Sequence, residues 1–134
     1  MTRYVWDASA VLAFLRAEPG AERLEAVLAD SRDHFLGAVN LAEVASWLNE
    51  RGMPADELNA FLTELDLHIR PFESALAAAT GLLRAPTKPK GLSLGDRACF
   101  ALAQSLDAVA LTTDREWRGL QLDIRIECIR PAAS

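Results

Sequence analysis

The stretch YVWDAS, residues 4–9, decides how the rest of the sequence is interpreted. Three strand-forming residues lead to the carboxylate Asp7, and a helical pattern begins at Ala8. Asp7 therefore ends a predicted strand over residues 4–7. In open parallel α/β sheets the carboxyl ends of the strands border the crevice that binds ligands, so other acids at this edge become candidates for a shared site.

Strand and helix patterns alternate along the whole chain, which implies right-handed crossovers between parallel strands. The expected fold is α/β: one domain over residues 1–134, a three-layer α/β/α sandwich whose central, mostly parallel sheet has about five strands. Strands are predicted at 4–7, 34–36, 67–70, 109–111 and 125–129, helices at 8–16, 21–30, 41–52, 54–66, 73–84 and 93–106, and an exposed loop at 85–91.

The composition favours one globular domain, because 134 residues with 51% hydrophobic content can enclose a sizeable core. Cys99 and Cys128 occur in apolar patterns without a C-x-x-C spacing, so we expect reduced core residues. An acid at position 7 interrupts any signal sequence, and no apolar run is long enough to span a bilayer. A soluble, cytoplasmic protein with no membrane association is expected.

Three further acids occur at the start of a helical pattern or just beyond an apolar run: Glu43, Asp96 and Asp114. We hypothesise that they share a divalent metal with Asp7. Clustered carboxylates repel one another unless a cation lies between them, and oxygen ligands suit Mg²⁺, with Mn²⁺ as a substitute. Such an ion lowers the pKa of a bound water, which is what phosphodiester hydrolysis requires.

Each of these acids also has a purely structural interpretation as a helix cap. Asn40-x-x-Glu43 and Ser93-x-x-Asp96 resemble capping boxes, while Asp7 and Asp114 precede helical segments. Capping does not require the four to converge at one edge of the sheet. Polar neighbours that are candidates to hydrogen-bond the ligands, or to serve in ordinary turns and caps, are Ser9, Asn40, Thr112 and Thr113.

The formal net charge of −5 opposes broad attraction to nucleic acid, so a phosphate substrate would need local cations. Candidates for guiding the phosphate backbone are Arg97 and Arg115, each one residue after a proposed ligand, and Lys88 and Lys90 in the predicted loop. Arg97 has the alternative of pairing with Asp96 or Glu43. Trp117, between two arginines, is a candidate to flank a substrate path, whereas His34 and His68 are assigned no catalytic role.

Four segments together resemble a known family: VWDASAV (5–11), AVNLAEV (38–44), GLSLGDRACFALA (91–103) and LTTDREW (111–117). They look like the PIN-domain nucleases and, within them, the VapC toxins of bacterial toxin-antitoxin operons. The match covers nearly the whole chain. Its Gly-Asp-Arg core, residues 95–97, is the most specific part, and Asp-Arg-x-Trp at 114–117 resembles one VapC subgroup.

The resemblance implies a Mg²⁺- or Mn²⁺-dependent endoribonuclease that holds its metal chiefly through Asp7 and Asp96, with Glu43 and Asp114 completing the site. It also implies a homodimer, a cognate VapB antitoxin, and transfer or ribosomal RNA as substrate. The four acids follow the family pattern. Asn40 departs from it, because the family often has Ser or Thr there.

Two other classes of function stay open. One is a catalytically inert PIN-fold module that only binds a partner. The other is a receiver-type phosphorylation switch, which is disfavoured because the only lysines lie in the 85–91 loop and Asp7 has no adjacent acid. A phosphatase of the D-x-D-x-T type is disfavoured because Ser9 occupies the place of its second Asp.

Overall fold

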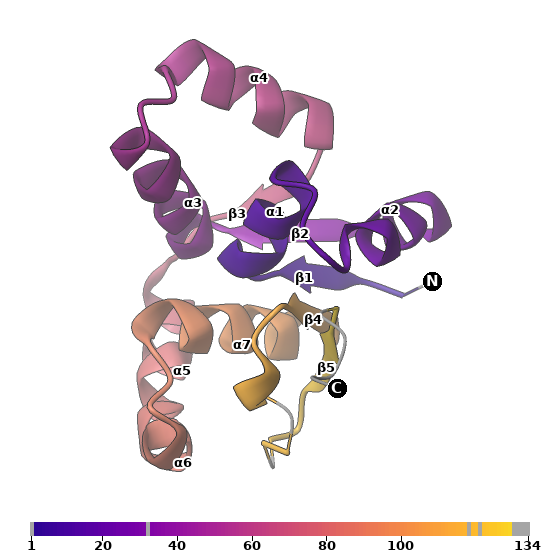
Figure 1. Ribbon diagram of the computed structural model, residues 1–134. Helices are drawn as coiled ribbons and strands as arrows, with labels where there is room; N and C mark the ends of the chain where they lie inside the picture. Colours follow the sequence, from indigo (N-terminus) through magenta and orange to yellow (C-terminus); the bar gives the residue numbers. More distant parts are fainter. Residues whose placement is uncertain (1, 32, 118, 121, 130–134) are drawn as a thin grey trace.

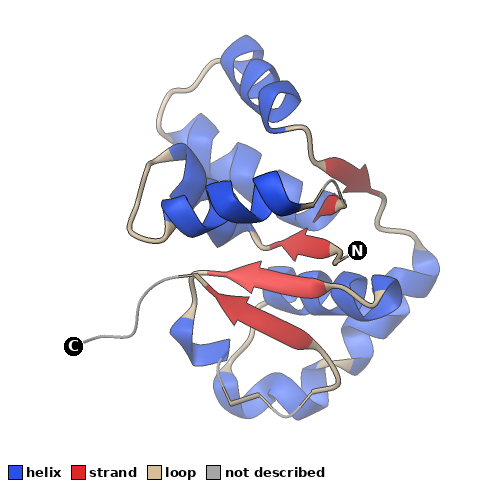
Figure 2. Ribbon diagram, turned by 90° about the vertical axis from the view of Figure 1, so that its right-hand side faces the viewer, coloured by secondary structure: helices blue, strands red, loops and turns tan. Residues whose placement is uncertain are grey.

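A computed structural model describes residues 2–31, 33–117, 119–120 and 122–129. Five parallel strands form one sheet in the order β3-β2-β1-β4-β5, drawn in red in Figure 2. The predicted α/β class and five-stranded parallel sheet are confirmed. The strands are β1 (Tyr4–Trp6), β2 (His34–Gly37), β3 (His68–Arg70), β4 (Val109–Thr112) and β5 (Arg125–Cys128).

Helices cover both faces of the sheet, which gives the predicted three layers. The two core clusters place α1 to α4 on one face and α5 and α7 on the other, and in Figure 1 the first group lies in the upper half of the view and the second in the lower half. The helices are α1 (Ala8–Leu15), α2 (Ala21–Asp30), α3 (Ala38–Glu50), α4 (Ala55–Leu65), α5 (Ser74–Leu82), α6 (Arg84–Thr87) and α7 (Leu94–Leu106), with 3₁₀ turns η1 (Lys88–Lys90) and η2 (Arg115–Trp117).

Strand β1 is the centre of the sheet and divides the core in two. Its side chains alternate: Tyr4 and Trp6 face the cluster under α1, α2 and α3, whereas Val5 faces the cluster formed with α7. Because both faces are covered, the strand is apolar throughout, as expected for a parallel sheet. β1 pairs with β2 on one side and β4 on the other, so Asp7 follows the middle strand.

The strand order also decides against the receiver-type alternative. Receiver domains have the order 2-1-3-4-5 with their site at the point where the order reverses. Here β1 lies between β2 and β4, so the reversal falls between β1 and β4. Asp7 follows one of these strands and Asp114 the other.

The predicted loop over residues 85–91 is mostly helical, because helix α6 and turn η1 occupy most of it. Its predicted exposure is confirmed except at Thr87, which is buried and whose hydroxyl donates to the Leu83 carbonyl at 2.6 Å. Two prolines suggested a loop, but proline is compatible with the first turn of a helix, and Pro89 lies in the first turn of η1.

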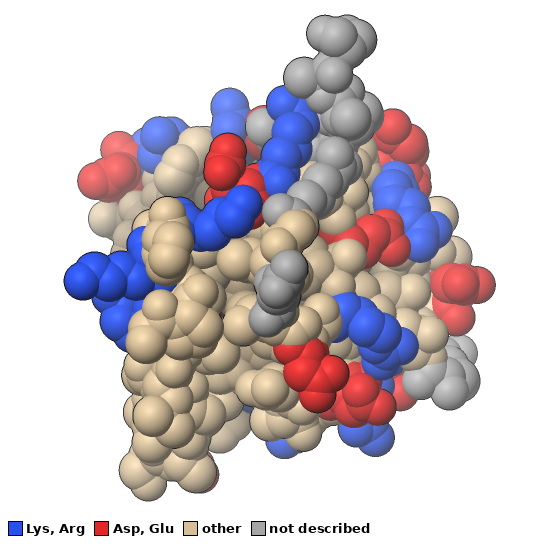
Figure 3. All heavy atoms as spheres, turned by 90° about the horizontal axis from the view of Figure 1, so that it is seen from below, with Lys and Arg blue, Asp and Glu red and all other residues tan. Residues whose placement is uncertain are grey.

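Charge is dispersed over the face formed by α5 to α7. Figure 3 views that side and shows basic and acidic side chains interspersed around its edge, with uncharged surface between them. Any attraction for a polyanion must therefore come from local groups. Within the described residues, no helix is both long and apolar enough to cross a membrane. Cys99 is buried in α7, as predicted for a core residue.

Candidate functional site

Asp7 is a buried carboxylate held at the junction of β1 and α1. It caps α1, since its Oδ2 accepts from the Ser9 amide at 3.4 Å and from the Ser9 hydroxyl at 2.6 Å. The Thr112 hydroxyl, at the end of neighbouring β4, donates to the same oxygen at 3.3 Å. These bonds fix one oxygen of Asp7, so capping and membership of a site are compatible.

Asp96 is held at the start of α7 by a capping box. Its Oδ2 accepts from the Ser93 amide at 3.0 Å, and the Ser93 hydroxyl accepts from the Asp96 amide at 3.1 Å. The structural interpretation of this pair is therefore confirmed. The same box orients the Asp96 carboxylate toward the crevice side of the sheet, because α7 begins at the edge where β1 ends.

Glu43 is positioned by a bridge between α3 and α7. The Asn40 amide group donates to Glu43 Oε1 at 2.8 Å and to the Gly95 carbonyl at 3.1 Å. The predicted capping box for Asn40 is wrong, because α3 already begins at Ala38 and Gly37 is its N-cap. A Cβ atom at Gly95 would overlap the Glu43 carboxylate, so glycine is needed for this close approach.

Asp114 follows β4 and caps η2, because its Oδ1 accepts from the Glu116 amide at 2.8 Å. The Asp114 amide in turn donates to the Thr112 hydroxyl at 3.0 Å, which links Asp114 to the oxygens around Asp7. Thr113 joins the network through its backbone: its amide donates to the Ser9 hydroxyl at 3.1 Å. Of the four predicted polar neighbours, Ser9 and Thr112 contact Asp7 directly, and Asn40 contacts Glu43.

The four acids act on one another electrostatically, with Asp96 at the centre. The pKa of Asp7 is raised to about 7, chiefly by burial; Asp96 and Glu43 contribute to the rise, and the hydrogen bonds from Ser9 oppose it. Desolvation also raises the pKa of Glu43 and of Asp96. Asp96 contributes to the raised pKa of Glu43, and Asp114 contributes to that of Asp96. Sequence-distant acids thus lie within electrostatic reach at one edge of the sheet.

The acidic side chains face a cleft of about 670 Å³ between α1, α3 and the start of α7. Three of them line it together with Trp47 on α3. The lining residues are Asp7, Ala8, Ser9, Leu12, Val39, Ala42, Glu43, Ser46, Trp47, Glu50 and Asp96. A single open cleft therefore joins the carboxylates to an aromatic side chain.

The donor set fits a hard divalent cation, since every candidate ligand is a carboxylate oxygen. Within the described residues, however, no three acidic, His or Cys side chains are close enough to form a ready cage. Mg²⁺ keeps several waters and commonly takes one or two protein carboxylates. The arrangement suits an ion bound directly by two acids, with the others acting through water.

The predicted cationic residues are placed differently from one another. Arg97 turns toward α5 and donates to the Thr80 carbonyl at 3.2 Å, although its charge lowers the pKa of Asp96. Lys88 and Lys90 are exposed on η1, and Arg115 is exposed on η2. The expectation that Trp117 flanks a substrate path is wrong, because Trp117 is fully buried against Phe100 at 4.2 Å between ring centroids.

A cationic cluster at the rim of the cleft was not predicted from the sequence. The guanidinium carbons of Arg51 and Arg16 lie 3.4 and 4.9 Å from the ring centroid of Trp47. The spacing of Trp47 and Arg51, four residues apart on a predicted helix, indicates that they share a face. Nothing in the sequence places Arg16 there, because it comes from a different helix.

Comparisons with known proteins identify a matching family and several structures with a similar fold. The PIN domain family model matches residues 4–121. DNA-bound VapBC from Salmonella typhimurium superposes with a TM-score of 0.71 at 20% identity, covering 95% of this chain and 98% of that one. VapBC2 from Rickettsia felis superposes with a TM-score of 0.73 at 16% identity, and the match covers 94% of this chain and 98% of that one.

A third similar structure is VapC20 from Mycobacterium tuberculosis, described as a sarcin-ricin loop cleaving toxin, with a TM-score of 0.69 and 17% identity over 91% of this chain and 98% of that one. At these identities the structural likeness concerns the fold. No curated protein gives a significant match. The family match spans most of the chain, including all four acids. The chain belongs to the PIN domain family.

Proposed function

We propose that this protein is a metal-dependent endoribonuclease and the toxin component of a VapBC-type toxin-antitoxin system. One observation carries the proposal: carboxylates from four separate segments lie at the carboxyl edge of the sheet, where Asp96 and Glu43 contribute to the raised pKa of Asp7, Asp96 to that of Glu43, and Asp114 to that of Asp96. Such an arrangement is unfavourable unless a cation neutralises it. The fold shared with VapBC toxins, one of them described as cleaving the sarcin-ricin loop, supports RNA as substrate.

In this proposal Asp7 and Asp96 hold Mg²⁺ or Mn²⁺, and Glu43 and Asp114 complete the site. The ion supplies Lewis-acid chemistry, activating water and offsetting negative charge on the phosphate. The chain provides the positioning: Ser9 and Thr112 fix Oδ2 of Asp7, Ser93 fixes Asp96, and Asn40 fixes Oε1 of Glu43. These bonds leave the second oxygen of Asp7 and of Glu43 to the cleft.

The proposed partners follow from the same assignment. VapBC and FitAB structures similar to this chain are toxin-antitoxin complexes, and several contain DNA. We therefore propose a VapB-type antitoxin as partner, a homodimer as assembly, and transfer or ribosomal RNA as substrate. Expression of this chain alone should arrest bacterial growth, and co-expression of its antitoxin should restore growth.

The decisive variant is Asp96→Asn. Asparagine still accepts from the Ser93 amide, so the capping box and the fold are retained, while a ligand charge is lost. We expect cleavage of bacterial total RNA in magnesium buffer to fall by a factor of at least about 10². Gel electrophoresis of end-labelled RNA measures this.

Asp107→Asn is the matched control. Asp107 ends the same helix in a left-handed conformation that asparagine also adopts, at the edge of the sheet opposite the cleft. It should cleave at the parent rate. If Asp96→Asn also cleaves at the parent rate after chelation and restoration of magnesium, the assignment of Asp96 is wrong.

An inert PIN-fold module is the second candidate, favoured by the absence of a ready metal cage among the described residues. Magnesium titration separates the two, with Trp47 as a reporter because it lines the cleft beside the acids. A nuclease should show a saturable change in tryptophan fluorescence that Asp96→Asn weakens. An inert module should show no saturable change.

A further inference from the structure

Resting on the proposed nuclease function, we infer that Arg16, Trp47 and Arg51 form a phosphate-binding subsite for the RNA strand beside the catalytic acids. We call these three residues the rim cluster. It adjoins the cleft that the acids line, because Trp47 lines that cleft together with Asp7 and Asp96. The cluster positions substrate and takes no part in bond cleavage.

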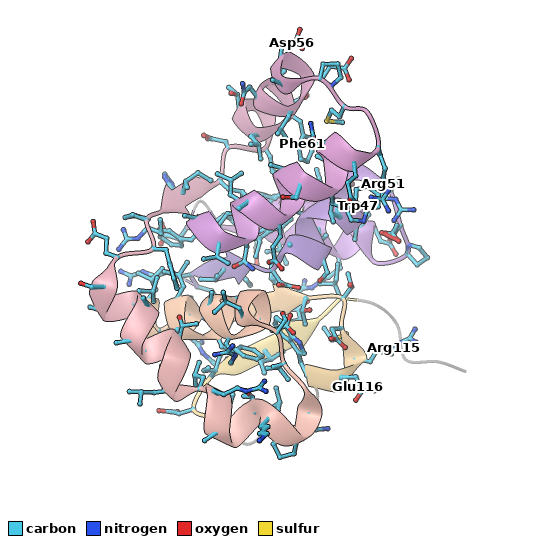
Figure 4. All side chains as sticks on the ribbon, turned by 90° about the vertical axis from the view of Figure 1, so that its left-hand side faces the viewer. Trp47, Arg51, Asp56, Phe61, Arg115 and Glu116 are labelled. Atoms are coloured by element: carbon cyan, nitrogen blue, oxygen red, sulfur yellow. The ribbon has the colours of Figure 1, made fainter. Side chains whose placement is uncertain are left out.

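The cluster presents two guanidinium groups around one indole ring. The Arg51 guanidinium carbon lies 3.4 Å from the ring centroid, and its Nη1 donates to the Trp47 carbonyl at 3.0 Å. The Arg16 guanidinium carbon lies 4.9 Å from the same centroid. Figure 4 shows Trp47 and Arg51 side by side at the C-terminal end of α3, with Arg115 lower down on the same side of the view.

Both guanidinium groups remain accessible to an anion. Stacking on an aromatic face uses the flat side of a guanidinium and leaves its N–H edge for a phosphate oxygen. Each arginine side chain is 51% exposed. Each also has one loosely paired acidic neighbour: Glu18 lies 3.5 Å from Arg16, and the highly exposed Glu50 lies 3.8 Å from Arg51. The Arg51–Glu50 pair is exposed on both sides, so it contributes little and is readily exchanged for a phosphate, whereas the Glu18 side chain is 26% exposed.

Charge explains why such a subsite is needed. The chain carries a net charge of −5, and the cleft itself is lined by carboxylates, so an RNA strand is repelled before it reaches them. Two fixed arginines at the rim attract a neighbouring phosphate. Of the cations predicted from the sequence, Arg97 is instead directed at the Thr80 carbonyl. The rim cluster supplies the attraction at the α3 side of the cleft.

The simpler alternative is that the cluster only ties two helices together. Arg16 is the C-cap of α1 and Arg51 is the C-cap of α3, so both cations also stabilise helix ends. A purely structural role predicts that substitutions in the cluster change only the free energy of unfolding. A phosphate subsite predicts that they also change the salt dependence of RNA binding.

The test uses the Asp96→Asn protein in magnesium buffer and a short fluorescein-labelled single-stranded RNA of mixed sequence, followed by anisotropy across a range of salt concentrations. Adding Arg16→Gln and Arg51→Gln should weaken binding at least about ten-fold. It should also lower the slope of log K against log salt by about 0.7 for each phosphate that the variant no longer neutralises. Trp47→Leu should weaken binding with an unchanged slope, because both charges remain.

Arg125→Gln is the matched control: Arg125 begins β5 at the opposite edge of the sheet and, like Arg51, donates to a backbone carbonyl. Its affinity and slope should equal those of the Asp96→Asn protein alone. If the double arginine variant keeps its affinity and slope while the parent cleaves RNA, the rim cluster only holds the ends of α1 and α3 together, and the nuclease proposal stands. If the parent neither binds nor cleaves RNA, both proposals fail.

Discussion

Gly95 is the residue whose missing side chain matters most to the site. A Cβ atom there would overlap the Glu43 carboxylate, which Asn40 holds against the Gly95 carbonyl. Alanine favours the helix over glycine by up to about 1 kcal/mol, so Gly95→Ala should fold normally. It should nevertheless displace Glu43 and lower RNA cleavage roughly ten-fold. Initial rates and thermal melting, measured on the same preparation, check this.

Gly81→Ala provides the control for that substitution. Gly81 lies in α5, where an added Cβ would meet nothing within 4 Å. The variant should gain up to about 1 kcal/mol in stability and cleave at the parent rate. Equal cleavage by the two alanine variants would show that the position of Glu43 is unimportant.

Asp7 makes the stability of the metal-free protein depend on pH. Its folded pKa is raised from 3.8 to about 7, so the folded state holds a proton that the unfolded state has released between these values. The free energy of unfolding should therefore fall as pH rises through this range, and level off above it. The difference is equivalent to at most about 4 kcal/mol, and the raised pKa values of Glu43 and Asp96 add in the same direction.

Urea denaturation in the presence of a chelator, repeated at intervals from about pH 4 to pH 8, measures this dependence. In Asp7→Asn the fall should be clearly smaller, because the largest contributor no longer ionises. A free energy of unfolding that rises over this interval in the parent would contradict the burial of Asp7 as the dominant cause.

At the scale of elements, β1 and β2 are joined by a side-chain bond as well as by their ladder. Trp6 Nε1 donates to His34 Nδ1 at 3.1 Å, so the ring proton is on Nε2, which donates to the Ser31 carbonyl at 2.8 Å. His34→Leu leaves both partners buried and unsatisfied. The free energy of unfolding should fall by about 2–4 kcal/mol, measured by urea denaturation. The exposed His68→Leu should change it by less than about 0.5 kcal/mol.

The elements themselves were largely predictable, because apolar periodicity and turn residues are local signals. Strand order, helix faces and the start of α3 were not, because they depend on tertiary packing. Asn40 illustrates the difference: its spacing from Glu43 looked like a capping box, but α3 begins two residues earlier and Asn40 bridges to Gly95 instead. The Ser93 and Asp96 box was predictable because both of its bonds are local.

At the scale of the whole molecule, the carboxylates could be found from the sequence and the rim cluster could not. Asp7 and Asp114 follow strands, Asp96 lies in the first turn of α7 and Glu43 one turn further along α3, and parallel strands end at a common edge, so topology brings the acids to one side of the sheet. Arg16 meets Trp47 only because the ends of α1 and α3 converge above the sheet. That convergence has no local signature in the sequence.

Binding of a divalent ion should stabilise the whole fold, because it removes the repulsion among the four acids. The melting temperature should rise with increasing Mg²⁺ or Mn²⁺ concentration. At an ion concentration one hundred times the dissociation constant, the free energy of unfolding should increase by about 2.7 kcal/mol. The ion competes with protons on carboxylates whose pKa values are raised, so the gain should shrink as pH falls below about 7. Asp96→Asn should lose most of the gain and Asp107→Asn none of it. An equal gain in these two variants would place the ion elsewhere on the surface.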